Sequence, residues 1–418
     1  MGMSKQAPLN TLRLGLDDTD HSEIGCTTER MANLINTIIS NMESVHIERR
    51  LVRLWPFAKR RTRGNGALGA TILIHEEDKE SFLSICSDWF SDLTTLTQNY
   101  PPSRIAPSPC LVISEEAVPE SWYWSAVRGE VDCEKRLLEV RNRGCTVLLS
   151  DSSWGVVGAS AAISWQPKDS SSWELIAWRE EKRIGSPRQV SEQSVMELEP
   201  LHPGAFVNRD PTKGRGLIAP RTPCPVLYGI RGATEHSVSA AHEWMQNRDD
   251  VESCSMYATH RTNQLSDDHI ESLNSGTVTS LPSETKGGHA VIHAISPERS
   301  YSLMAFSEGG PVNRLLRSLI PGDMISWAGL LAPDDSIHLE KLRVDTPSPR
   351  IAGRPVCCAI SMRSEGKGQG LRCNICGNRT PKYWMCNSWQ ESLNVGIGEW
   401  VEPTPSNRRH LARPVSLM

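Results

Sequence analysis

The stretch from Leu12 to Thr28, LRLGLDDTDHSEIGCTT, constrains the fold of this chain more than any other. Its alternating leucines predict a half-buried strand. The run ERMANLINTII that follows predicts a helix, with Thr27 or Thr28 as its N-terminal cap. Between the strand and the helix lie Asp17, Asp18 and Asp20. Because open α/β sheets bind ligands in the crevice at strand ends, we expect the acids and the hydroxyls to face one site.

These residue types suit phosphate chemistry with a divalent cation. Clustered carboxylates hold Mg²⁺ together with phosphate oxygens, and the N–H groups at a helix N-terminus attract a phosphate. A threonine hydroxyl at that position can receive a phosphoryl group or contact one. The alternative for DDTD by itself is an acidic turn in which Asp and Thr serve the backbone.

A second stretch, Arg50 to Ala67, reads RLVRLWPFAKRRTRGNGA and ends in a glycine-rich turn. Glycines let a backbone approach a phosphate closely, and guanidinium groups bind phosphate through two parallel hydrogen bonds. The turn is therefore a candidate phosphate cradle. Taken alone, the stretch fits a basic surface loop that ends in a hairpin turn better.

Composition limits the class of protein. A chain of 418 residues has room for several domains with cores of their own. No run is long and apolar enough to span a membrane, and MGMSKQAPLN is not a signal segment. We therefore expect a cytoplasmic protein without a membrane partner, whose 12 cysteines are reduced thiols or metal ligands.

Charge is distributed unevenly along the chain. Residues 340–418 hold 12 Lys and Arg against 6 Asp and Glu, whereas the remainder holds 33 against 43. A basic C-terminal region on an acidic body indicates where an anionic polymer would bind. An excess of this size also arises by ordinary fluctuation.

The order of apolar patterns and turns predicts four regions. Residues 10–105 read as an α/β sandwich that ends in the Pro- and Ser-rich link YPPSRIAPSP. Residues 106–280 alternate apolar strands with short helices. Residues 281–348 hold several short strands with a Gly-Asp turn, a pattern that suits a small OB-type barrel or a structural spacer. Residues 349–418 hold the remaining cysteine motif.

That cysteine motif is half of a structural zinc site. Cys373 and Cys376 form a C-x-x-C knuckle followed by glycine, and structural zinc needs four ligands, commonly from two such knuckles. Upstream stand the adjacent Cys357 and Cys358, with Cys386 as a spare candidate. We expect zinc, in a distorted or three-cysteine site if need be. The alternative is a ribbon that has lost its metal and is held by packing.

Taken together, GLDDTD, CTT, RLVRL and TRGNGA, in this order and spacing, resemble the archaeal tRNA(Ile)-agmatinylcytidine synthetase family. The resemblance continues along almost the whole chain. Its later segments are LIAPRTPCPVLYGIRG (Leu217–Gly232), THRTNQLSDDH (Thr259–His269), SEGKGQGLRCNICG (Ser364–Gly377) and EPTPSNRRHLARP (Glu402–Pro414).

The resemblance implies an α/β multidomain fold and one reaction. The domains would be kinase-like (10–105), ferredoxin-like (106–280), an OB-fold barrel that binds RNA (281–348), and a zinc ribbon with a basic tail (349–418). The enzyme would be an ATP-dependent ligase. It would conjugate agmatine to ring position two of the wobble cytidine in the CAU-anticodon isoleucine tRNA through a phosphorylated cytidine, with AMP as the adenylate product. The modified tRNA would read AUA codons instead of AUG. The enzyme would need ATP, Mg²⁺ and Zn²⁺.

The resemblance also implies roles for residues that match the motifs. The catalytic residues would be Asp17, Asp18, Asp20, Thr27 and Arg61. ATP and its phosphates would bind to Thr28, Arg63, Gly64, Asn65 and Gly66. The other substrates would bind to Asn208, Asp210, Tyr228, Gly229 and Arg231. Zinc would bind to Cys357, Cys358, Cys373 and Cys376.

Several positions depart from the family's usual pattern. Ile24 and Gly25 stand where Gly-Met is usual, Arg61 replaces a lysine, His21 a serine, and Glu29 an aromatic residue, and Trp154 stands where the family has an arginine. Two other classes therefore stay open. One is an ATP-dependent kinase or ligase of a small molecule, which has no use for the barrel. The other is a non-catalytic RNA-binding protein, which has no use for the clustered carboxylates.

Overall fold

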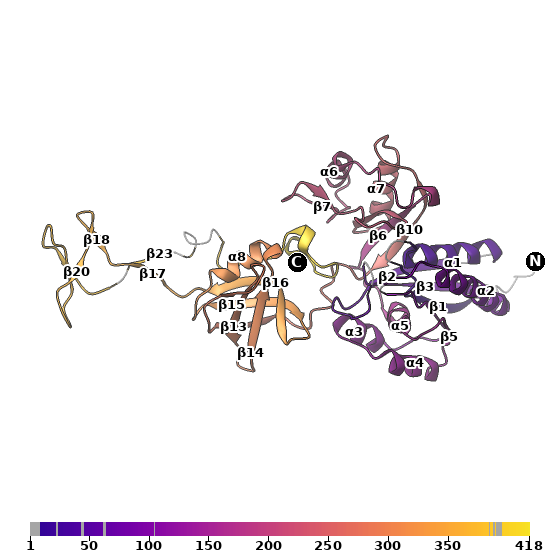
Figure 1. Ribbon diagram of the computed structural model, residues 1–418, viewed down its shortest axis with the longest axis horizontal. Helices are drawn as coiled ribbons and strands as arrows, with labels where there is room; N and C mark the ends of the chain where they lie inside the picture. Colours follow the sequence, from indigo (N-terminus) through magenta and orange to yellow (C-terminus); the bar gives the residue numbers. More distant parts are fainter. Residues whose placement is uncertain are drawn as a thin grey trace, which may run out of the picture. The chain divides into compact units, whose positions relative to one another are not determined.

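The computed structural model describes residues 9–21, 24–42, 46–61, 64–103, 105–383, 385–387, 389 and 395–418 (Figure 1). The chain forms two compact units. Unit 1 comprises Met1–Glu271 together with Arg408–Met418, and unit 2 comprises Ser272–Asn407. None of the helices in the described ranges is long and apolar enough to cross a membrane.

Unit 1 alternates strands and helices, in agreement with the α/β class expected from the sequence. Its helices are α1 (Thr27–Asn41), α2 (Lys79–Gln98), α3 (Ser121–Arg128), α4 (Cys133–Asn142), α5 (Val156–Ser164), α6 (Glu192–Leu201) and α7 (Glu235–Gln246). Its strands are β1 (Leu9–Asp17), β2 (His46–Arg53), β3 (Gly66–His75), β4 (Cys110–Ser114), β5 (Thr146–Leu149), β6 (Ser172–Arg179), β7 (Arg209–Asp210), β8 (Arg215–Gly216), β9 (Val226–Gly232) and β10 (Cys254–Thr262).

One eight-stranded sheet organises unit 1, in the order β5-β4-β1-β3-β2-β10-β6-β9. Strand β1 lies between β3 and β4 and is antiparallel to both, with Gly15 opposite Gly69 and Asp17 opposite Cys110. Because β4 and β5 extend the same sheet, residues 110–149 are continuous with the strands of the N-terminal region. The domain boundary predicted near residue 105 falls between β3 and β4, which belong to the same sheet. That boundary stays a prediction.

The two faces of the sheet are covered by different helices (Figure 1). Helices α1 and α2 bury an apolar stripe against one face, and in α1 this stripe includes Met31, Leu34, Ile35 and Ile38, at helical spacing. Helices α3, α4 and α5 cover the other face. Helices α6 and α7 pack on β6 and β9. The helix and strands predicted around the DDTD and TRGNG motifs are thus confirmed.

Helix α5 lies unusually close to the sheet because β1 and β3 carry glycine where it crosses them. A Cβ atom on Gly15 would come 2.1 Å from the carbonyl oxygen of Ala159, and one on Gly69 would come 2.8 Å from that of Ala162. The close approach brings the N-terminal turn of α5 against the end of β1, where the carboxylates are.

The predicted cap of α1 is wrong in one detail. The N-cap residue is Cys26, in an extended conformation and with no side-chain cap bond, so Thr27 is the first helical residue. The carboxylate of Asp20 accepts the Thr27 N–H instead, at 2.5 Å. A loop carboxylate therefore does what a threonine cap would have done, and the hydroxyl of Thr27 is left for other contacts.

Unit 2 contains a closed five-stranded barrel. Its strands are β11 (Asn274–Val278), β13 (Ala290–Ile295), β14 (Ser300–Ala305), β15 (Met324–Leu331) and β16 (Ser336–Thr346), with α8 (Pro311–Arg317) between β14 and β15. The order around the barrel is β11-β13-β14-β16-β15, and β15 pairs with β11 to close it. The contact between β14 and β16 is parallel, and the others are antiparallel. Strands β12 (Ser283–Glu284) and β24 (Trp400–Val401) add to its edges.

The cysteine-bearing segment of unit 2 consists of short strands. They are β17 (Arg350–Gly353), β18 (Val356–Cys357), β19 (Ile360–Ser361), β20 (Arg363–Ser364), β21 (Leu371–Arg372), β22 (Arg379–Thr380) and β23 (Met385–Asn387). They pair as β17-β23, β18-β19 and β20-β21-β22. The apolar cluster of this segment is small, with Met362, Leu371 and Cys373 as its buried members. So little buried apolar surface is typical of a fold that a metal holds together.

Candidate active site

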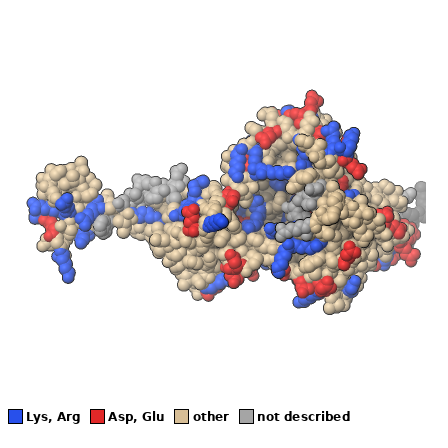
Figure 2. All heavy atoms as spheres, in the orientation of Figure 1, with Lys and Arg blue, Asp and Glu red and all other residues tan. Residues whose placement is uncertain are grey.

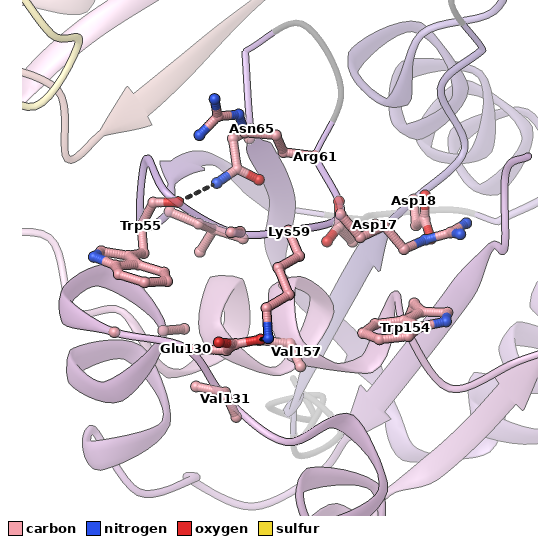
Figure 3. Close-up of a pocket in the computed structure, with 17 residues that line it drawn as sticks. Asp17, Asp18, Trp55, Lys59, Arg61, Asn65, Glu130, Val131, Trp154 and Val157 are labelled. Carbon is pink, nitrogen blue, oxygen red and sulfur yellow. Dashed lines mark hydrogen bonds and ion pairs between the residues drawn. The ribbon is translucent and has the colours of Figure 1, made fainter. Parts of the chain in front are cut away.

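Two carboxylates at the end of β1 face a pocket that we call the carboxylate pocket (Figure 3). Asp17 and Asp18 line one side of it together with Trp154, and Trp55 lies on the opposite side. Burial and the neighbouring carboxylates raise the pKa of Asp17 well above its usual range. Burial also raises the pKa of Asp18 to about 7, against the lowering effect of Arg60. Crowded acids of this kind are poised to exchange their protons for a cation.

Asp18 is held by its backbone and by one arginine. Its φ angle is 59°, in the left-handed region. Its carbonyl oxygen accepts the N–H of Ser108 at 3.0 Å, and its carboxylate accepts the Nε–H of Arg60 at 2.9 Å. Arg60 also donates to the carbonyl oxygen of Ala106. The basic segment before TRGNG is thus fastened to the acidic segment after β1.

The third carboxylate turns toward the helix. Asp20 Oδ1 accepts both the N–H of Thr27 and its hydroxyl, the latter at 2.9 Å. The hydroxyl of Thr19 donates to Thr27 Oγ1 at 3.1 Å. Both threonines are buried. The Thr27 oxygen therefore sits at a helix N-terminus beside a carboxylate that can accept its proton, an arrangement that activates a hydroxyl as nucleophile.

The hydroxyl of Thr28 has other partners than that of Thr27. Its hydroxyl lies 3.0 Å from Cys26 Sγ and accepts the indole N–H of Trp178 at 3.2 Å. Sequence reasoning assigned phosphate binding to Thr28, and this remains a prediction. The structure gives that hydroxyl a partner on β6.

The described residues of the TRGNG turn are linked by hydrogen bonds to the segment Arg53–Trp55. Asn65 has a φ angle of 42°. Its side-chain amide donates to the carbonyl oxygen of Trp55 at 2.7 Å, and its own carbonyl accepts the N–H of Leu54 at 2.9 Å. Arg53 Nη1 donates to the carbonyl oxygen of Gly64 at 3.0 Å. Arg61 lines the carboxylate pocket with Asn65 (Figure 3). Arg63 lies outside the described residues.

A second pocket, which we call the threonine pocket, lies on the other side of this turn. Gly66 borders both pockets. The polar residues that line the threonine pocket come from six segments of unit 1: Asp20, Thr27, Thr28, Arg53, Glu174, Arg221, Thr222, Arg231 and His410. The DDTD motif thus divides between the pockets, with Asp17 and Asp18 in one and Asp20 in the other. On the face of unit 1 that Figure 2 shows, Lys and Arg side chains rim a hollow.

A buried charge network in the threonine pocket escaped the sequence reasoning. Glu174, on β6, is buried, accepts a hydrogen bond from Gln264, and lies 3.5 Å from Arg53 Nη2 and 3.8 Å from Arg231 Nε. Burial lowers the pKa of Arg231. The Nε atom of Arg53 is buried and has no hydrogen-bond partner among the residues that the structure describes. Two guanidinium groups against one shared carboxylate leave capacity to bind an anion.

The five predicted substrate residues do not all meet in one place. Gly229 and Arg231 line the threonine pocket. Asn208 is buried and exchanges hydrogen bonds with the backbone of Arg231. Asp210 accepts hydrogen bonds from the N–H and hydroxyl of Thr212. Tyr228 is buried against His242 and Gln246. Substrate contact by these three stays a prediction, and their described contacts are with the protein.

The four predicted zinc ligands come together in unit 2. The Sγ atoms of Cys357, Cys358, Cys373 and Cys376 all lie within 4.8 Å of one another. Cys357 Sγ lies 3.5 Å from Cys376 Sγ and 4.0 Å from Cys358 Sγ. Four thiolates around zinc at about 2.3 Å stand roughly 3.8 Å apart, so the spacing fits that metal. The φ angle of 48° at Cys358 turns the adjacent cysteine toward the same centre.

The fold and the site define a class of α/β protein that combines a carboxylate cluster at the end of a sheet strand with a small barrel. Residues 13–149 match the family model described as the TiaS TCKD domain, and residues 154–269 match the TiaS FLD domain. The chain is 30% identical to the isoleucine-tRNA 2-agmatinylcytidine synthetase TiaS of Cenarchaeum symbiosum, over 99% of this chain and 94% of that protein. It is 30% identical to the enzyme of Methanopyrus kandleri, over 97% and 96%. The chain belongs to the isoleucine-tRNA 2-agmatinylcytidine synthetase family, as its motifs indicated.

Solved structures of that family share the fold. The crystal structure of TiaS in complex with its isoleucine tRNA and ATP matches with a TM-score of 0.84 at 26% identity, over 98% of both chains. The complex of TiaS with that tRNA, AMPCPP and agmatine matches with a TM-score of 0.80 at 25% identity, again over 98% of both.

Proposed function

We propose that this chain is a tRNA-modifying enzyme that uses ATP to conjugate agmatine to the wobble cytidine of the isoleucine tRNA with a CAU anticodon. Its family membership over nearly the whole chain supports the substrates. The observation that carries the proposal at the level of chemistry is the pair of pockets on either side of Gly66, with the DDTD carboxylates divided between them.

The reaction runs in two steps. The O2 atom of the cytidine attacks a phosphoryl group of ATP, and the phosphorylated oxygen becomes a good leaving group. The primary amine of agmatine then attacks C2, a C–N bond forms, the C–O bond breaks, and phosphate leaves while the amine gives up its proton. We assign AMP as the adenylate product, which requires that both phosphoanhydride bonds of ATP are cleaved. One phosphoryl group would go to the Thr27 hydroxyl and the other to the cytidine O2, and water would later release the phosphate from Thr27. The wobble base lies in a loop and is therefore inexpensive to extrude into a pocket.

The carboxylate pocket suits ATP. Arg61, Asn65 and Gly66, which line it, would offer guanidinium and backbone groups to the phosphates. Arg63 keeps its predicted role by its motif alone. The indole of Trp154, 47% exposed at the pocket wall, offers a stacking face to the adenine. Base stacking of this kind contributes about 1–3 kcal/mol.

The acids fit Mg²⁺. Asp17 and Asp18 supply hard oxygen ligands, and burial raises the pKa of both carboxyl groups, against the lowering effect of Arg60. A bound Mg²⁺ would neutralise the charge that develops on the transferred phosphoryl group. Asp20, in this proposal, holds the Thr27 hydroxyl and accepts its proton when Thr27 receives one of the two phosphoryl groups that ATP gives up.

The threonine pocket suits the activated cytidine and agmatine. Arg53 and Arg231 would bind the phosphate, and the carboxylate of Glu174 would attract one cationic end of agmatine. We add Glu174 and Arg53 to the residues expected from the sequence, with Thr28, Asn208, Asp210, Tyr228 and Gly229 kept as the earlier candidates.

Unit 2 would hold the RNA. The barrel suits an OB fold. Its strands follow the order β11-β13-β14-β16-β15, β14 and β16 are parallel, and helix α8 follows β14. We propose that the four-cysteine cluster binds Zn²⁺ as a ribbon. We also propose that residues 10–105 act as a kinase-like domain and that residues 106–280 act as a ferredoxin-like domain.

The test is a mass measurement of the wobble nucleoside. Incubation of the protein with unmodified CAU-anticodon isoleucine tRNA, ATP, Mg²⁺ and agmatine should add the mass of agmatine less water to that cytidine. Asp20→Ala should abolish the product while the melting temperature stays near that of the native chain. An unmodified cytidine with the native protein would overturn the proposal, and ATP consumption without it would favour the small-molecule enzyme.

A further inference from the structure

The segment Arg408–Met418, which we call the C-terminal tail, belongs to unit 1 although it follows unit 2 in the sequence. It pairs with the segment through which the chain leaves unit 1. The N–H of Leu265 donates to the carbonyl oxygen of His410 at 3.0 Å, and that of Asp267 donates to the carbonyl of Leu411 at 2.9 Å. The tail is therefore hydrogen-bonded into the catalytic unit.

Side chains of the tail also fix it against the segment that precedes the TRGNG turn. Leu411 is 2% exposed and packs in an apolar cluster that contains Leu54 and Ala126. The guanidinium of Arg409 lies 5.3 Å from the ring centre of Phe57, within the range of a cation–π contact. Leu54 and Phe57 lie a few residues before the turn, so the tail braces the phosphate cradle from outside.

His410, between these two anchors, lines the threonine pocket together with Asp20, Thr27, Arg53 and Arg231. It is an exposed residue. Arg53 and Arg231 are the charged groups that act on its ring. An imidazole beside two positive charges is neutral near pH 7.

We propose that His410 is a positioning residue of the threonine pocket, presented to it by the C-terminal tail. The inference rests on the proposed function and deepens it. A phosphate held by Arg53 and Arg231 needs both guanidinium groups aimed at it, and a polar ring beside them can fix their orientation without adding a third positive charge. The tail thus completes a pocket whose other lining residues all lie within Met1–Glu271.

Three variants of one position separate positioning from packing. His410→Ala removes the ring, His410→Asn keeps a neutral polar group, and His410→Lys adds a charge. Leu417→Ala is the matched control, because Leu417 lies in the same tail but lines a different cavity. All four are compared with the native chain by single-turnover agmatine conjugation, tRNA affinity and melting temperature.

His410→Ala should slow conjugation at saturating substrates by about tenfold or more, since misplaced binding groups act mainly on the reaction step. It should leave tRNA affinity unchanged. His410→Asn should recover to within a few-fold, and His410→Lys should not. Native rates in His410→Ala, or equal losses in His410→Asn and His410→Ala, would overturn the proposal. So would a loss in Leu417→Ala as large as in His410→Ala.

A calorimetric titration that measures the binding of inorganic phosphate separates this inference from the proposed function. It needs no turnover. His410→Ala should bind phosphate several-fold more weakly than the native chain, and Leu417→Ala should bind it equally well. If the native protein conjugates no agmatine, the proposed function fails while the phosphate titration still decides the role of His410. Equal phosphate affinity in all variants would overturn that role.

Discussion

Substitution of Gly158 tests whether the close packing of α5 on the sheet matters for the rate of the reaction. A Cβ atom built on it would lie 1.9 Å from Asp17 Oδ2, 2.5 Å from Asp17 Cγ and 3.0 Å from the Cβ of Ala67. An ordinary contact needs well over 3 Å, so Gly158→Ala must push either the Asp17 carboxylate or the helix aside by more than an ångström.

The magnitudes follow from that displacement. Overpacking of this kind costs about 1–3 kcal/mol, and replacing glycine inside a helix returns roughly 1 kcal/mol. The net loss of unfolding free energy should therefore be small, at most about 2 kcal/mol. Catalysis should suffer more, because a misplacement of about 1 Å in a reacting group can cost roughly 100-fold in rate.

The assay is single-turnover conjugation of agmatine, with chemical denaturation measured on the same preparations. Gly309→Ala is the control, since a Cβ there meets nothing within 4 Å. It should change neither quantity. If Gly158→Ala folds stably and conjugates at the native rate, the position of the Asp17 carboxylate does not matter to the reaction, and the assigned carboxylate site is wrong.

Three further outcomes follow from the site. Burial raises the pKa of Asp18 from 3.8 to about 7, so the unfolding free energy of the metal-free protein should fall as pH rises from about 4 to 7. Chemical denaturation in the presence of EDTA should show this fall, and Asp18→Asn should make it smaller. Trp154→Ala should raise the KM for ATP by about fivefold or more through lost stacking, whereas Trp154→Phe should raise it less. Cys373→Ser should lower the zinc content measured by mass spectrometry and weaken tRNA binding; full zinc content would exclude this ligand.

Local patterns were enough to predict the elements that carry the motifs. Strand β1, helix α1 and the strand pair β2 and β3 are all signalled by apolar spacing and turn residues that lie within a few positions of one another. The acids at the end of β1 could be found in the same way. The cap of α1 could not, because Asp20, six residues before the N-cap, satisfies the Thr27 N–H through the loop.

Arg53 and Glu174, in the threonine pocket, lay beyond sequence reasoning for a physical reason, although Asp20, Thr27 and Arg231 of the same pocket were predicted. Arg53, Glu174 and Arg231 are adjacent only because β2, β10, β6 and β9 stand in that order in the sheet. Nothing within a short window distinguishes a buried, paired glutamate in WELIAWR from a charge on the exposed face of a strand. The buried charges become recognisable only when the pairing of distant strands is known, and the same holds for His410.

The return of the chain to unit 1 has a consequence for how the enzyme is made. A ribosome synthesises residues 272–407, with the barrel and the cysteine cluster, before it reaches His410 and Leu411. A nascent chain that has emerged only as far as the catalytic sheet still lacks part of the threonine pocket wall and the leucine that fills the core beneath the phosphate turn. Incompletely synthesised chains would therefore be poor catalysts, and the proposed reaction would begin only in chains that already carry unit 2.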